Sequence, residues 1–142
     1  MIEITTQGFK LTLNPKVYDG PTPYNMNLQA DIVSTNFSVS TEIDTGSLQF
    51  NEFINQLIKM YNSLKETAEL TGNDNQKIVF EATRTGKIII KGNLGRCFKD
   101  EDYKVSFAVE VDQTDLSKSV RNIEKEIRLL YETQNHRVTI VN

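Results

Sequence analysis

The stretch from Tyr103 to Leu116 reads YKVSFAVEVDQTDL, and it contains the change of periodicity that decides the fold. Apolar and polar side chains alternate up to Val111, which indicates a β-strand with one buried face. From Leu116 to Tyr131, apolar residues recur every three or four positions, which indicates an amphipathic helix. The chain therefore passes directly from a core strand into a core helix.

The polar joint between these two elements, from Asp112 to Thr114, has two interpretations. In the first, Thr114 or Asp115 caps the helix, while Asp112 is stabilised by the positive end of the helix dipole. In the second, the acid and the neighbouring amide of Gln113 work together in a cleft at the end of the strand. No other residue pattern converges on a cleft, so capping is favoured.

The same two patterns describe the rest of the chain. A helix is predicted from Ser47 to Leu64, with an apolar stripe that includes Phe53, Leu57 and Tyr61. The segment 92–102 is predicted to be a connection, because it contains glycines and charged residues. Period-two alternation predicts strands at residues 2–4, 9–13, 26–32, 37–43, 78–82, 87–91 and 103–111, with a short terminal strand at 138–141.

These elements predict an α+β fold. Because one side of most strands is polar, we expect an antiparallel sheet of six to eight strands with one open face. The two amphipathic helices are expected to pack on its other face, so that every apolar surface is covered. Residues 1–142 are predicted to form a single domain, since this length buries one core without additional cross-links.

Composition excludes several classes of protein. The net charge is −3, and no cluster of basic residues predicts a nucleic-acid partner. No apolar run is long enough for a membrane span, and no signal sequence is recognised, so we expect no membrane association and a cytoplasmic location. The single cysteine, Cys97, cannot form an internal disulfide.

Few residues suggest catalysis or metal binding. His136 is the one histidine of the chain, and a solvated loop position is the favoured interpretation. Cys97 is predicted to be a small buried or half-buried thiol rather than a nucleophile. Asp100, Glu101 and Asp102 lack the spacing of calcium ligands. We therefore expect no catalytic residues, no cofactor and no metal.

Three segments together resemble immunity proteins of the WapI type. They are the helical spacing of Phe53, Leu57 and Tyr61, the segment from Gly86 to Gly92, and the strand from Phe107 that runs through Asp112 to Leu116. The resemblance extends from about Met26 to Tyr131. It implies a small cytoplasmic protein that neutralises the toxic C-terminal domain of a secreted bacterial polymorphic toxin. It supplies no catalytic residues and does not locate the interface.

Three functions remain open. The first is the toxin-neutralising immunity protein implied by the resemblance, not an enzyme, acting as a monomer or a weak homodimer. The alternative is a small enzyme or ligand carrier with a pocket between the sheet and the helices. The third is a structural or regulatory subunit. Inward positions are nearly all apolar, which favours a protein that acts through its surface.

The open face of the predicted sheet carries acidic residues that suit a basic toxin. Complementary charge speeds encounter and fixes register. Charge reversal at Glu42 and Asp44 is expected to slow association while leaving thermal stability nearly unchanged. The acids predicted to bind the partner are Asp31, Glu42, Asp44, Glu81 and Glu110.

Overall fold

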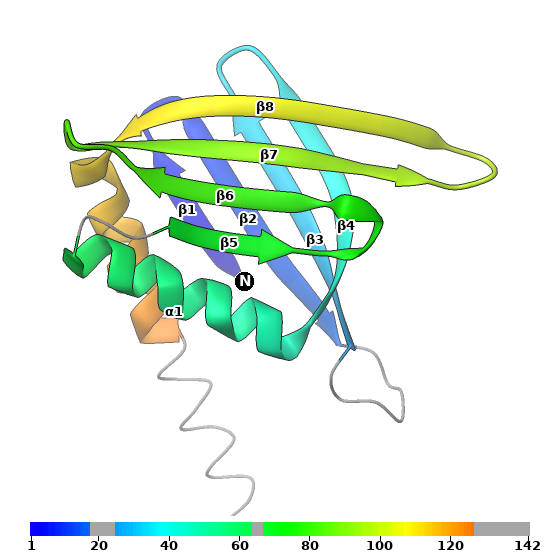
Figure 1. Cartoon of the computed structure of the whole chain (residues 1–142), viewed down its shortest axis with the longest axis horizontal. Coiled ribbons are helices and arrows are strands. Elements are labelled where there is room, and N and C mark those ends of the chain that lie inside the picture. The colour runs from blue at the N-terminus through cyan, green and yellow to red at the C-terminus, as the bar shows by residue number, and fades with distance from the viewer. Residues whose placement is uncertain (18–24, 64–66, 127–142) are drawn as a thin grey trace, which may run out of the picture.

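The computed structural model describes residues 1–17, 25–63 and 67–126, arranged as two antiparallel sheets and two helices (Figure 1). The first sheet has the order β1-β2-β3-β4 and the second has the order β5-β6-β7-β8. Each sheet is a meander that is followed by a helix. The predicted terminal strand at 138–141 lies outside the described residues.

The first sheet follows the predicted alternation closely. Its strands are β1 (Ile2–Thr6), β2 (Phe9–Val17), β3 (Asn25–Ser34) and β4 (Ser38–Gly46). Gly8 has a φ of 83°, which a glycine adopts without strain, and it makes the tight turn from β1 to β2. Buried side chains such as Ile4, Leu11 and Leu28 lie on one face, and polar side chains lie on the other.

The helix predicted from its apolar stripe is present as α1 (Ser47–Ser63), and it connects the two sheets along the chain. Its buried face includes Phe53 and Leu57, and the Phe53 ring packs 5.9 Å from the ring of Phe80. The second helix, residues 113–126, buries Leu116, Val120 and Ile123 in the same core. Phe53 and Phe80 therefore belong to one core with the second helix, as expected, whereas Ile127 onward lies outside the described residues.

The second sheet consists of β5 (Thr67–Thr71), β6 (Lys77–Ala82), β7 (Lys87–Cys97) and β8 (Asp102–Asp112). A short 3-10 helix, η1 (Asn73–Asn75), separates the first two of these strands. No sequence pattern predicted β5. The prediction of a connection at residues 92–102 was also wrong, since β7 continues through Gly92 to Cys97 and pairs with β8 over its whole length.

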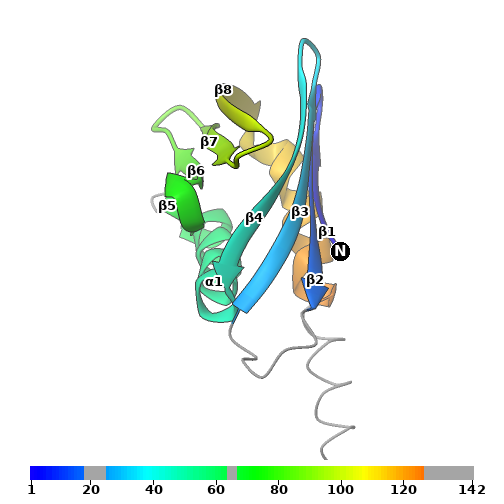
Figure 2. The same cartoon turned by 90° about the vertical axis from the view of Figure 1, so that its right-hand side faces the viewer.

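The α+β class, the antiparallel pairing and the two helices are confirmed, but the strands form two sheets instead of one. The two sheets face each other across the core, and α1 lies beside β5, with which it makes most of its contacts (Figure 2). Each sheet therefore keeps an outer polar face. Two outer faces that point in different directions replace the one open face that the sequence predicted.

Side chains bond to the backbone at one position on each edge of the first sheet. At β1, the hydroxyl Oγ of Ser119 lies 3.0 Å from the backbone N–H of Thr5, which donates to it, and 3.4 Å from the Thr5 carbonyl oxygen, to which it donates. At β4, the side-chain amide Nε2 of Gln76 donates to the carbonyl oxygen of Glu42 at 3.2 Å. These contacts satisfy backbone groups that an edge strand otherwise leaves unpaired.

Candidate functional site

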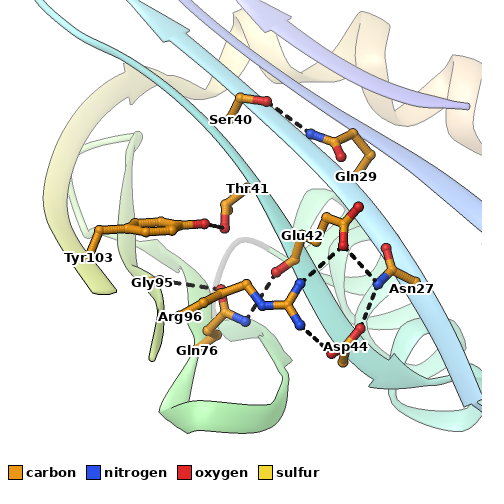
Figure 3. Close-up of polar contacts among 10 residues, drawn as sticks. All are labelled: Asn27, Gln29, Ser40, Thr41, Glu42, Asp44, Gln76, Gly95, Arg96 and Tyr103. Carbon is orange, nitrogen blue, oxygen red and sulfur yellow. Dashed lines mark hydrogen bonds and ion pairs between the residues drawn. The ribbon is translucent and has the colours of Figure 1, made fainter. Parts of the chain in front are cut away.

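The most organised polar feature of the described residues lies where β7 crosses the edge of β4. Here Arg96 of β7 reaches two carboxylates of β4 (Figure 3). Its Nη1 donates to Glu42 Oε2 at 3.1 Å, and its Nη2 donates to Asp44 Oδ2 at 2.8 Å. Asn27 of β3 donates from Nδ2 to Asp44 Oδ1 at 2.6 Å. We call these four residues the Arg96 cluster.

The cluster is a partly buried ion-pair network. The Arg96 side chain is 12% exposed, whereas Glu42 and Asp44 are 40% and 31% exposed. The guanidinium can serve both acids because its planar fork presents separate donors in fixed directions. Two buried atoms in the cluster, Arg96 Nε and Asn27 Oδ1, have no hydrogen-bond partner among the described residues. The carboxylates thus face solvent while their common counter-ion is held inside.

Neighbouring contacts fix the position of Arg96. The preceding Gly95 donates its backbone N–H to Gln76 Oε1 at 3.3 Å, so Gln76 connects β7 to the edge of β4. The hydroxyl groups of Tyr103 and Thr41 share a hydrogen bond between β8 and β4. The Arg96 guanidinium carbon lies 4.3 Å from the centre of the Phe98 ring, a cation-π distance. All these contacts lie at the same end of the β7–β8 hairpin.

A surface groove of about 430 Å³ runs beside this cluster. The β4 side is lined by side chains from both faces of that strand, among them Val39 and Ser40, so the groove follows the free edge of β4. The opposite wall comes from the β7–β8 hairpin and includes Phe98, Glu101 and Tyr103. We call this hollow the β4 groove.

The five acids predicted to bind a partner are divided between the two sheets. Asp31, Glu42 and Asp44 lie on the outer face of the first sheet, where Asp31 also accepts a hydrogen bond from Ser40 Oγ at 2.7 Å. Glu81 and Glu110 lie on the outer face of the second sheet, and Glu81 pairs with Lys91 at 3.2 Å. The structure brings Glu42 and Asp44 together at Arg96, places Asp31 on the same face of the first sheet, and separates these three acids from the other two.

The contacts of Glu42 and Asp44 change one expectation. Reversing both charges would place two positive side chains beside the largely buried guanidinium of Arg96. The variant would then lose stability as well as charge complementarity. Charge reversal at Glu42 and Asp44 is therefore expected to lower thermal stability, and the sequence-based expectation of nearly unchanged stability does not hold for these two positions.

The strand-to-helix joint is a cap, although the capping residue differs from the prediction. Asp112 Oδ1 accepts hydrogen bonds from the backbone N–H of Thr114 at 3.1 Å and from its hydroxyl at 3.0 Å. Asp112, not Thr114 or Asp115, thus supplies the acceptor at the start of the second helix. The bond from the Thr114 N–H, with further contributions from the Thr114 hydroxyl and Lys87, lowers the pKa of Asp112.

The other candidates for chemistry remain apart. Cys97 is exposed, which corrects the prediction of a buried or half-buried thiol. His136 lies outside the described residues. Within the described part of the chain, no three histidine, cysteine or acidic side chains gather closely enough to hold a metal ion. None of the helices described there is both long and apolar enough to cross a membrane.

The fold and the Arg96 cluster define a small α+β protein with a packed apolar core and its polar residues at the surface. The chain belongs to the WapI-like immunity protein family, which it matches over residues 1–130. This match confirms the resemblance that the sequence suggested. No curated protein and no solved structure matches the chain.

Sequence reasoning missed Arg96, Gln76 and Asn27. The partners of Arg96 lie 52 and 54 positions away in the chain, so no local pattern identifies them.

Proposed function

We propose that this protein neutralises the toxic C-terminal domain of a cognate bacterial polymorphic toxin by binding it. Membership of the immunity protein family carries the proposal, because the match extends over most of the chain. The protein would act as a stoichiometric inhibitor without a reaction of its own. It would act in the cytoplasm of the toxin-producing cell, as a monomer or a weak homodimer.

The surface supports a binding role. Both sheets carry charged and polar residues on their outer faces, while the volume between them is filled by apolar side chains such as Phe53, Phe80 and Leu28. The acids Asp31, Glu42 and Asp44 gather near the β4 edge, and they would attract a basic toxin domain. Glu81 and Glu110 remain proposed contact residues only for a partner that also reaches the outer face of the second sheet.

The alternative, a small enzyme or ligand carrier, would use a pocket between the sheets and helices. The β4 groove does lie between β4 and the β7–β8 hairpin, but it follows a strand edge, and within the described part of the chain its lining includes neither a histidine nor a cysteine. The protein-binding role therefore has the better support from the described residues.

Co-expression tests the proposed function. The C-terminal domain of a polymorphic toxin whose gene adjoins this one should arrest growth alone, and co-expression of this protein should restore growth. The purified proteins should form a stable complex in size-exclusion chromatography. Growth arrest that persists despite soluble, folded protein, with no complex formed, would contradict the proposal.

A variant separates binding from catalysis. Simultaneous replacement Cys97→Ala and His136→Ala should leave protection at the wild-type level, because binding needs neither a thiol nucleophile nor a general base. Growth should be scored over a range of toxin expression levels, with circular dichroism as the control for folding. Loss of protection by a folded variant would indicate catalysis or a contact at one of these residues.

A further inference from the structure

The free edge of β4 is open to another strand. In the described part of the chain, β4 pairs with β3 alone and ends the sheet order. The turn bond from Ser34 N to the Phe37 carbonyl oxygen, 2.8 Å, fixes which residues of β4 face β3. Backbone groups of an antiparallel strand alternate between its two sides. Those of Ser38 and Ser40 must therefore point away from β3, into the β4 groove.

The bond made by Gln76 supports the same alternation. It reaches the carbonyl oxygen of Glu42, which lies two residues beyond Ser40 and thus on the same side of β4. At Glu42 the edge is occupied by the Gln76 side chain, and Arg96 lies beside it. Around Ser38 and Ser40 the edge is bordered by the groove instead. Among the described residues, the edge available to another strand is therefore the short stretch around Ser38 and Ser40.

The groove also carries charge and an exposed aromatic ring. Among its charged lining residues, Arg96 and Glu42 belong to the Arg96 cluster and offset each other, whereas Glu101 is an acid outside that cluster. Asp31 accepts a hydrogen bond from the hydroxyl of Ser40, so another carboxylate lies beside the groove. Phe98 is 52% exposed on the hairpin wall. Large aromatic side chains of this kind often contribute most to binding at interfaces.

We propose that the toxin domain inserts an extended, basic segment into the β4 groove and pairs it with the free edge of β4. The backbone of Ser40 would hydrogen-bond to the segment, Glu101 and Asp31 would meet its basic side chains, and Phe98 would cover one of its apolar side chains. Edge-strand addition supplies affinity through the backbone, while neighbouring side chains supply specificity. The inference rests on the proposed function and locates its interface.

Proline substitution tests the backbone contact. Ser40→Pro removes the N–H that points into the groove and leaves the bonds to β3, as proline is tolerated at strand edges. Ser106→Pro is the matched control, because the turn bond from Phe98 N to Glu101 O places Ser106 on the free side of β8 by the same alternation. Ser40→Ala controls for loss of the hydroxyl bonds to Gln29 and Asp31.

The expected result is a loss of affinity that is specific to the edge. Isothermal titration against the purified cognate toxin domain, identified by the co-expression test, should show binding weakened at least about tenfold by Ser40→Pro and less than about threefold by Ser40→Ala or Ser106→Pro. Thermal denaturation verifies that each variant is folded. Equal affinity of folded Ser40→Pro and wild type would overturn the proposal.

Side-chain substitutions provide an independent test that leaves the strand intact. Phe98→Ala should weaken binding, whereas Leu48→Ala, which truncates a 71% exposed apolar residue on α1, should not. Glu101→Lys should slow association and reduce its dependence on salt, whereas Glu52→Lys, which makes the same charge change at an exposed position on α1, should not. Equal effects within either pair would place the interface elsewhere.

Binding and protection by the wild-type protein distinguish a failure of the proposed function from a failure of the proposed interface. If wild-type protein neither binds nor protects against the toxin domain, the proposed function fails. If wild type binds and every groove variant binds equally well, only the assignment of the groove fails. Self-association of the free protein that Ser40→Pro abolishes, without any change in toxin affinity, would assign the edge to a second copy of this chain and overturn the proposal.

Discussion

Two polar clusters connect the elements of this fold, and they differ in sequence separation and exposure. The Asp112 joint is local, since its bonds join residues two positions apart at an exposed strand end. The Arg96 cluster joins residues more than fifty positions apart and holds a guanidinium that is 12% exposed. A charge removed from water depends more strongly on its partners than an exposed one. The long-range cluster should therefore contribute more to stability.

The largest effect is expected where the backbone itself positions the Arg96 cluster. Gly95 has a φ of 152°, and a Cβ at this position would overlap the carbonyl oxygen of Tyr103 on β8. Gly95→Ala should lower the free energy of unfolding by about 2–3 kcal/mol, measured by urea denaturation.

Gly86→Ala is the matched control for that substitution. Gly86 also has a positive φ, 79°, but the nearest atom to an added Cβ lies 4.0 Å away. It should cost only about 1 kcal/mol, the backbone contribution alone. Equal losses for the two variants would show that the crowding at Gly95 is unimportant.

An intermediate effect is expected from removing the central charge. Arg96→Ala leaves Glu42 and Asp44 close together without their common counter-ion, while both keep partial access to water. The free energy of unfolding should fall by about 1–3 kcal/mol. Lys10→Ala, which breaks an exposed pair with Glu3 at 3.8 Å, should change it by about 0–1 kcal/mol. A loss at Arg96 no greater than that at Lys10 would show that partial burial gives the Arg96 cluster no advantage over an exposed ion pair.

The smallest effect is expected at the Asp112 joint, and it should depend on pH. The pKa of Asp112 is lowered in the folded protein, chiefly by the Thr114 N–H, so its carboxylate adds stability above its unfolded-state pKa. This contribution is lost as the pH falls below about 4, through the folded-state value. The stability difference between wild type and Asp112→Ala should therefore shrink on acidification.

Asp112→Asn is the control for ionisation. Asparagine also caps helices but does not titrate, so the stability difference between Asp112→Asn and Asp112→Ala should stay constant across the same pH range. Thermal denaturation between pH 7 and pH 3 measures both differences. A wild-type advantage that does not change with pH would show that the charge of Asp112 is irrelevant to the cap.

Local patterns predicted most of the first sheet because its alternation is clean. Gly8 marked its first hairpin, and Phe53, Leu57 and Tyr61 marked α1. The pattern failed at β5, since Ala68 and Leu70 form a buried alternation of only five residues directly after a helix. It also failed at β7, where Gly92 was taken for a turn. The Phe107 ring occupies the space in which a side chain at position 92 would lie, so this glycine allows close packing within the strand.

The degree of burial was harder to predict than the presence of each element. Phe107 lies in the long alternating strand predicted at 103–111; it packs against the core but is only partly buried, and its ring lies 5.3 Å from the ring of Phe37. The run from Ile88 to Ile90 is apolar at every position, so its sequence does not show which face is buried. Pairing with Val111 and Val109 turns Ile88 and Ile90 inward and leaves Ile89 half-buried. The residues on neighbouring strands therefore determine how deeply Phe107 and Ile88 to Ile90 are buried.

The sequence by itself determined the α+β class, the antiparallel strands, the two helices and the family, because each depends on periodicity or on the order of segments along the chain. Tertiary structure alone decided the division into two sheets, the separation of Glu81 and Glu110 from the other three acids, and the pairing of Arg96 with Glu42 and Asp44. Contacts between residues far apart in the chain follow from how sheets pack and where strands end. Local periodicity contains no information about those long-range contacts.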